Sequence, residues 1–206
     1  MAADDGHLVD ALTEALRGDE AGFSVLWTAL QPPLLRYLRV LVGEAAEDVA
    51  SETWLQAARD LHGFRGDLAG FRVWLFRIAR HRAIDDRRRG RRQVQDPYDP
   101  TTQEHLVTSP DAEREAMEEL GTRWALAVIA TLPPDQAEAV MLRVVAGLDV
   151  AQTAQVLGKR PGAVRIAAMR GLRRLANHPQ VLARGRTRAR ETAPLPTVDS
   201  AQPEGV

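Results

Sequence analysis

The chain has 206 residues, 45% of them hydrophobic and 27% charged, which is ordinary for a globular protein of one or two domains. It contains no cysteine, which excludes disulfides, cysteine-ligated zinc and thiol-based sensing within this chain. The formal net charge is −1, and no run approaches the ~20 apolar residues of a membrane span, so we expect a cytoplasmic protein without membrane insertion.

The predicted elements are helical from the first residues onward. Only 5% of the residues are aromatic and the apolar ones are mainly Ala, Leu and Val, which favours an all-α fold. In residues 6–42 apolar side chains recur at spacings of three and four, with Asp19 predicted to cap a second helix and Pro32 and Pro33 to open a third. Residues 44–64 form the next predicted helix, whose acidic residues come early, where the helix dipole favours them.

A glycine-containing loop leads into an arginine-rich helix, predicted from Phe71 to about Arg89. The residues predicted to face the core are Phe71, Trp74, Leu75 and Ile78. The basic residues that fall together on the opposite side are Arg77, Arg80, Arg87 and Arg88. We therefore expect residues 1–92 to form one helical domain.

Residues 93–111 carry three prolines and several acidic residues, which is typical of a flexible acidic linker. Residues 112–178 are predicted to form a second helical domain, in which one helix ends before Pro133 and another runs on to about Leu148. Residues 179–206 begin basic and then become polar and proline-containing, so a disordered tail is predicted.

The second domain contains a candidate helix-turn-helix. Asp149 is a natural N-cap, Gly158 can adopt the left-handed C-cap conformation, and Pro161 can open the following helix. The side of this last helix predicted to pack holds Val164, Ala168, Leu172 and Leu175. The opposite, cationic side suits the major groove of DNA and holds Arg165, Ile166, Met169, Arg170 and Arg173.

Charge is separated into blocks along the chain. Residues 65–92 contain ten arginines and three aspartates, and residues 159–190 contain ten basic residues and no acidic ones. Between them, residues 95–121 carry eight acidic residues and one arginine. Since phosphate neutralisation supplies most non-specific nucleic-acid affinity, two cationic blocks on one chain indicate a protein that grips a polyanion at two places.

Two blocks of sequence carry a resemblance to a known family. They are AEDVASETWLQAARDLHGFRGDLAGFRVWLFRIARHRAIDDRRRGRR and LPPDQAEAVMLRVVAGLDVAQTAQVLGKRPGAVRIAAMRGLRRL. With this order and separation the chain, from about residue 11 to 177, resembles a bacterial RNA polymerase sigma factor of the extracytoplasmic-function (ECF) subfamily, which keeps only regions two and four. The resemblance implies a two-domain factor that binds core RNA polymerase, recognises and helps to melt promoter DNA, catalyses no reaction itself and is restrained by a separate anti-sigma factor.

The resemblance also assigns site residues. It places polymerase docking on the acidic helix, at Glu47, Asp48, Glu52, Trp54 and Leu55. It assigns the loop at residues 62–70 and the helix after it to the melted minus-ten element, with the candidate side chains Arg77, Arg80, His81, Arg87 and Arg88. It assigns the helix-turn-helix to the minus-thirty-five element, with Lys159 and Arg160 on phosphate and, as readers, Arg165, Ile166, Met169, Arg170 and Arg173. The family often has other residues where this chain has Ser51, His81 and Ala167, so base preference is not carried over at those positions.

Other interpretations of the same residues remain open. Trp27, Trp74 and Trp124 are expected to pack in the core. His81 and Asp85 are four residues apart, a spacing that can place two metal ligands or an acid–base pair on one helix face, but no further ligand completes a metal site and none is expected. A one-component helix-turn-helix regulator would bind operator DNA without polymerase, usually as a dimer. The second basic helix, in the first half of the chain, favours the sigma factor.

Overall fold

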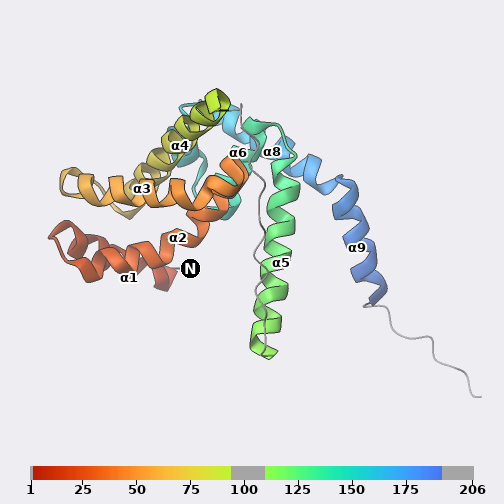
Figure 1. The fold of residues 1–206 in the computed structure, drawn as a ribbon, viewed down its shortest axis with the longest axis horizontal. Helices are drawn as coiled ribbons and strands as arrows, with labels where there is room; N and C mark the ends of the chain where they lie inside the picture. The colour runs from red at the N-terminus through yellow and green to blue at the C-terminus, as the bar shows by residue number, and fades with distance from the viewer. Residues whose placement is uncertain (1, 94–109, 192–206) are drawn as a thin grey trace, which may run out of the picture.

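The computed structural model describes residues 2–93 and 110–191, and every regular element within them is helical, which confirms the all-α prediction (Figure 1). We call the first described range the N-terminal module. Its elements are α1 (Ala2–Leu16), α2 (Glu20–Val42), the 3-10 turn η1 (Gly43–Ala45), α3 (Ala46–Asp60), the 3-10 turn η2 (Leu61–Gly63) and α4 (Leu68–Gln93). The second range is the C-terminal module. Its elements are α5 (Pro110–Ala130), α6 (Pro134–Val140), the π-helical turn η3 (Met141–Val145), α7 (Val150–Leu157), α8 (Pro161–Ala176) and α9 (Pro179–Glu191).

Helix α2 is one long helix where two were expected. As predicted, Asp19 caps it, because its carboxylate accepts a hydrogen bond from the Ala21 amide at 2.8 Å. The helix then continues through Pro32 and Pro33 instead of restarting there. Each proline removes a backbone donor from the helix, and the buried Leu30 and Leu34 on either side hold α2 against the core and offset that loss.

Tryptophans are less buried than the sequence analysis expected. Trp27 is 45% exposed, so its predicted place in the core is wrong; Leu26 and Leu30 take the core-facing positions of this part of α2. Trp74 is half-buried in an aromatic group with Phe64 and Phe71, whose ring centroids lie 5.2 and 5.6 Å from its own. Trp124 is also half-buried, and the Arg184 guanidinium lies over its ring at 4.4 Å.

The C-terminal module contains the predicted helix-turn-helix. The Asp149 carboxylate accepts from the Gln152 amide while the Gln152 side chain accepts from the Asp149 amide, which forms a capping box at the start of α7. Gly158 ends α7 with a left-handed φ of 64°, and Pro161 begins α8. Val164 and Ala168 are buried as predicted, whereas Leu172 is 47% exposed and that part of the prediction is wrong.

Two features of the C-terminal module were not predicted. The helix expected to run on to Leu148 changes into a π-helical turn at Met141, whose wider backbone buries both Met141 and Leu142 and leaves Val144 exposed. Helix α9 covers residues 179–191, where disorder was expected, and residues 192–206 lie outside the described range. Most of the predicted acidic linker also lies outside the described residues.

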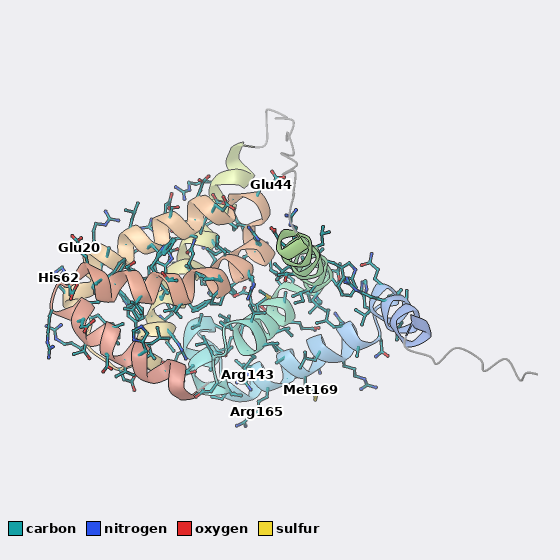
Figure 2. The ribbon with its side chains drawn as sticks, turned by 90° about the horizontal axis from the view of Figure 1, so that it is seen from below. Glu20, Glu44, His62, Arg143, Arg165 and Met169 are labelled. Atoms are coloured by element: carbon teal, nitrogen blue, oxygen red, sulfur yellow. The ribbon has the colours of Figure 1, made fainter. Side chains whose placement is uncertain are left out.

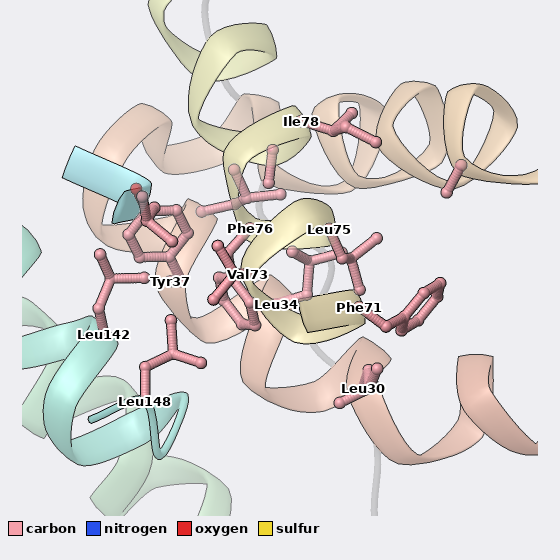
Figure 3. Packing of buried hydrophobic residues seen from close by; sticks show 14 of the residues in the cluster. Leu30, Leu34, Tyr37, Phe71, Val73, Leu75, Phe76, Ile78, Leu142 and Leu148 are labelled. Atoms are coloured by element: carbon pink, nitrogen blue, oxygen red, sulfur yellow. The ribbon is translucent and has the colours of Figure 1, made fainter. Parts of the chain in front are cut away.

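The two modules pack against each other and share one hydrophobic core. Figure 3 shows Leu142 and Leu148 of the C-terminal module facing Tyr37 of α2 and Phe76 of α4. All four side chains are at most 1% exposed. Contacts of α2 with η3 and of α4 with α7 complete this junction, so the described structure is a closed arrangement of the modules.

Candidate nucleic-acid and polymerase interfaces

The predicted docking surface lies on α3. Asp48 and Leu55 are exposed, the latter at 64%, and are free to contact a partner. Glu47 is also exposed and pairs with Arg39 of α2 at 3.5 Å. Trp54 is different, because it is only 6% exposed and its indole N–H donates to the Gln31 side chain at 2.6 Å. Its ring also packs edge-on against Phe23 at 5.7 Å, so Trp54 joins α3 to α2 and offers little surface to a partner.

The partly exposed Glu52 side chain of α3 forms ion pairs with α4. Its carboxylate lies 3.7 Å from the Arg82 guanidinium and 3.6 Å from that of Arg89. Arg82 also donates to the Gln56 side chain at 3.0 Å, which fixes α4 along α3. Arg82 and Arg89 were not among the predicted site residues, although both belong to the arginine-rich helix that follows α3.

The loop at residues 62–70 is held by its own side chains. The Arg65 guanidinium donates to the carbonyls of His62 and Phe64, at 2.8 and 2.7 Å. The Asp67 carboxylate accepts from the Gly70 amide at 2.8 Å and begins α4. The aromatic group of Phe64, Phe71 and Trp74 packs on the inner side of the loop. The backbone of the loop therefore lies at the surface, next to the N-terminal half of α4.

The predicted minus-ten side chains on α4 do not share one environment. Arg77, His81, Arg87 and Arg88 are exposed, and Arg88 lies 3.9 Å from Asp85. These four can reach the phosphates of a single strand along α4. The fifth, Arg80, is only partly exposed.

Arg80 is paired with the other module. Its Nε lies 2.6 Å from the Glu138 carboxylate of α6, and the two side chains are only 22% and 13% exposed. Burial lowers the pKa of Arg80, but the hydrogen bond and charge of Glu138 outweigh burial, so the net shift is upward and the guanidinium stays charged. The neighbouring Tyr37 is fully buried, and burial together with the Glu138 charge raises the pKa of its hydroxyl well above the usual value, which keeps it neutral.

The reading side of α8 is open. Ile166 and Met169 are 48% and 61% exposed, and Figure 2 shows Arg165 and Met169 projecting from the outer edge of this helix. Arg170 and Arg173 are exposed as well. The opposite side of α8 approaches α6 closely, because a Cβ at Gly171 would lie 2.7 Å from the Val140 side chain. The structure therefore brings all five predicted readers to one accessible surface.

The two predicted phosphate contacts flank the turn. Arg160 is exposed, while the Lys159 ammonium lies 2.6 Å from the Asp135 carboxylate at the start of α6. Towards the C-terminal end of α8 there is a polar hollow of ≈ 440 Å³, whose lining is Gln136, Arg170, Arg173, Arg174 and Asn177. Three guanidinium groups in one hollow make this end of α8 attractive to a phosphate backbone.

Within the described ranges, no helix is long and apolar enough to cross a membrane. The same residues contain no cluster of three or more His, Asp or Glu side chains arranged to hold a metal ion. His81 and Asp85 are both exposed, with Asp85 beside Arg88.

Family models match both modules. The model for Sigma-70 region 2 matches residues 26–93, and the model for Sigma-70 region 4 matches residues 122–175. The first match contains the docking helix, the loop and α4, and the second contains the helix-turn-helix and its reading side. The two regions follow one another in the order that the sequence analysis expected.

Named relatives extend the match over most of the chain. The ECF RNA polymerase sigma factor ShbA of Streptomyces griseus is 32% identical over 187 residues, which cover 85% of this chain and 97% of ShbA. SigD of Mycobacterium tuberculosis is 32% identical over 177 residues, covering 82% of this chain and 83% of SigD. BldN of Streptomyces coelicolor is 31% identical over 180 residues, and the match spans 84% of this chain but only 66% of BldN.

Solved structures share the fold at lower identity. CnrH, solved in complex with the cytosolic domain of CnrY, has a TM-score of 0.57 and 20% identity, covering 83% of this chain and 96% of CnrH. RpoE of Bartonella quintana, solved with the anti-sigma factor NepR, has a TM-score of 0.56 and 22% identity, covering 75% of this chain and 94% of RpoE. With regions 2 and 4 both matched and relatives above 30% identity along most of its length, the chain belongs to the ECF family of RNA polymerase sigma factors.

Proposed function

We propose that this sigma factor binds core RNA polymerase through α3, opens the minus-ten element with α4 and the loop before it, and reads the minus-thirty-five element with α8. The observation that carries this proposal is the open side of α8, where a capped helix-turn-helix presents three arginines, Ile166 and Met169 together. Arginine can bind guanine edges in pairs of hydrogen bonds, and the two apolar side chains suit the thymine methyl group.

We assign the domains as first expected, with residues 1–92 for polymerase and minus-ten contacts and residues 112–178 for the minus-thirty-five contact. On α3, the side chains of Asp48 and Leu55 contact the polymerase directly. Glu47 and Glu52 also contact it, but each carboxylate is at the same time paired with arginines of α2 or α4. Trp54 then acts by holding α3 on α2. The chain contributes binding energy and no catalytic group, and it works in the cytoplasm, where the polymerase meets DNA.

A protein antagonist is part of this proposal. The solved relative RpoE of Bartonella quintana is bound to the anti-sigma factor NepR. An apolar hollow of ≈ 550 Å³ between α2, α5 and η3 supports a similar partner here, with Arg36 at its rim and Val144 62% exposed within it. An amphipathic helix with acidic residues would fit a hollow of this composition.

Reconstituted transcription tests the function. Core RNA polymerase with the wild-type chain should give promoter-directed run-off products from genomic fragments, while core enzyme alone should not. The Arg170→Ala variant should lose about tenfold in affinity for its minus-thirty-five sequence, since a side chain that contacts a base edge contributes about 1–3 kcal/mol.

The control is Arg17→Ala, which removes one exposed arginine in the turn between α1 and α2, outside the C-terminal module. It should leave promoter choice and affinity as in the wild type. Unchanged promoter choice in Arg170→Ala would contradict the assigned reading side. Specific binding of the free chain to duplex DNA as a dimer, with no effect on the polymerase, would instead support a one-component regulator.

A further inference from the structure

Helix α6 pairs with one proposed DNA-binding residue from each module. Its Glu138 binds Arg80 of α4 at 2.6 Å, and its Asp135 binds Lys159 before α8, also at 2.6 Å. The two pairs differ in burial. Asp135 is 71% exposed at its side chain, so water and a phosphate can compete for Lys159, whereas Glu138 is only 13% exposed and the Arg80 pair is closed off.

The Arg80 pair lies at the junction between modules. Val40, Leu41 and Arg87 of the N-terminal module line a small cavity of ≈ 130 Å³ together with Leu132 and Glu138 of the C-terminal module. Beside it, Tyr37 is buried against the shared core and neutral. Because Glu138 of α6 holds the Arg80 guanidinium, whose side chain is only 22% exposed, a nucleic-acid strand can pair with Arg80 only after this contact has opened.

We infer that the free protein is held closed by α6, whose Glu138 carboxylate occupies the position of a DNA phosphate at Arg80, so that binding of the melted strand and docking of the C-terminal module exclude each other. This inference rests on the proposed function, since it takes Arg80 to be a contact of the melted strand. A carboxylate and a phosphate oxygen are both anionic acceptors for the same guanidinium, which makes them direct competitors.

The competition has a thermodynamic consequence. If only the open form binds the strand through Arg80, the apparent affinity of the free protein falls in proportion to the open fraction. Removing the Glu138 charge leaves the partly buried Arg80 guanidinium without its counter-charge in the closed form, and a buried charge that has lost its ionic partner destabilises the arrangement that buries it. The open fraction and the affinity for single-stranded DNA should then rise together.

The experiment measures both quantities on the full chain. The chain has no cysteine, so Ala29→Cys on α2 and Gln155→Cys on α7, both at exposed positions, can carry a pair of spin labels for distance measurement. Single-strand binding is followed by fluorescence anisotropy with a labelled mixed-sequence DNA of about twelve nucleotides, a length within the usual site sizes of single-strand binders.

We expect the labelled wild type to give one short-distance population. Glu138→Gln, which keeps the shape of the side chain and removes its charge, should add a longer-distance population and bind the single strand about tenfold more tightly, equivalent to a tenfold larger open fraction. The matched control is Asp135→Asn, which makes the same charge change on the same helix but breaks a pair within one module. The labelled Asp135→Asn chain should give the same single short-distance population as the labelled wild type.

A second measurement uses the spin-labelled chain without any substitution in α6. When the labelled wild type is saturated with the single strand, the short-distance population should disappear. Persistence of that population at saturation, or an unchanged distance and affinity in natively folded Glu138→Gln, overturns the inference. Failure of the proposed function would show differently, as a wild-type chain that directs no promoter-dependent initiation by core polymerase.

Discussion

Gly22 sets the distance between α1 and α2. A Cβ at this position would lie 2.6 Å from the Ala11 carbonyl oxygen and 2.8 Å from the Ala15 amide nitrogen, and neither backbone atom can move without displacing α1. Only a residue without a side chain allows this approach, so the glycine joins the first helix to the core.

The variant Gly22→Ala should therefore lower the free energy of unfolding by about 2 kcal/mol, because the strain of overpacking exceeds the gain in helix propensity of about 1 kcal/mol. Urea unfolding followed by circular dichroism measures the change. Gly6→Ala is the matched control, since Gly6 lies in α1 with nothing within 4 Å of its Cβ position. It should be neutral or slightly stabilising; an equal loss in both variants would refute the steric explanation.

Individual residues also show what sequence can reveal. The caps at Asp19 and Asp149 were predictable because a capping side chain binds amides only two or three residues away. The outward position of Trp27 and the pairing of Arg80 with Glu138 were not, since each depends on which distant helix covers that side. Helical periodicity identifies a basic side of α4 but not the part of it that another module covers.

At the scale of elements, the helix-turn-helix was readable from local signals. Its cap, its left-handed Gly158 and its opening Pro161 all act within a few residues of the chain. The continuous α2 and the π-helical turn η3 were not readable, because packing around them overrides local preference. Pro32 and Pro33 lie inside a helix whose neighbouring leucines are buried, and η3 widens so that two consecutive apolar side chains enter the core.

The capping box gives a prediction for α7. Asp149→Ala should cost about 1 kcal/mol and let the first turn of α7 fray, because the Gln152 amide loses its acceptor at 2.8 Å. Hydrogen exchange at the amides of α7 should become faster, while exchange in α3 should not change. Asp149→Asn retains an oxygen acceptor and should behave nearly as the wild type. Equal exchange rates in all three proteins would show that the cap does not limit fraying.

At the scale of the whole molecule, the modules depend on each other for burial. Leu142 and Leu148 complete the surroundings of Tyr37 and Phe76, so neither module has a closed core alone (Figure 3). Both domains were predictable from sequence, but their packing was not, because each apolar side is equally consistent with a core inside its own module.

A shared core predicts a single unfolding transition. Leu148→Ala should lower the free energy of unfolding by about 3 kcal/mol, as expected for a leucine truncated in a core. Its effect should appear equally in circular dichroism, which reports all helices, and in tryptophan fluorescence, to which the N-terminal module contributes Trp27, Trp54 and Trp74. Val144→Ala is the control, because Val144 is 62% exposed. Two separate transitions, with only one displaced, would contradict a common core.

The shared core also limits how such proteins can be recombined. A hybrid that joins this N-terminal module to the C-terminal module of a relative would inherit whatever side chains that relative has at the positions of Leu142 and Leu148. A small or polar residue there would leave Tyr37 and Phe76 facing water in the unbound hybrid. Chimeras chosen only for their promoter preference would thus differ in solubility and yield for reasons unrelated to DNA.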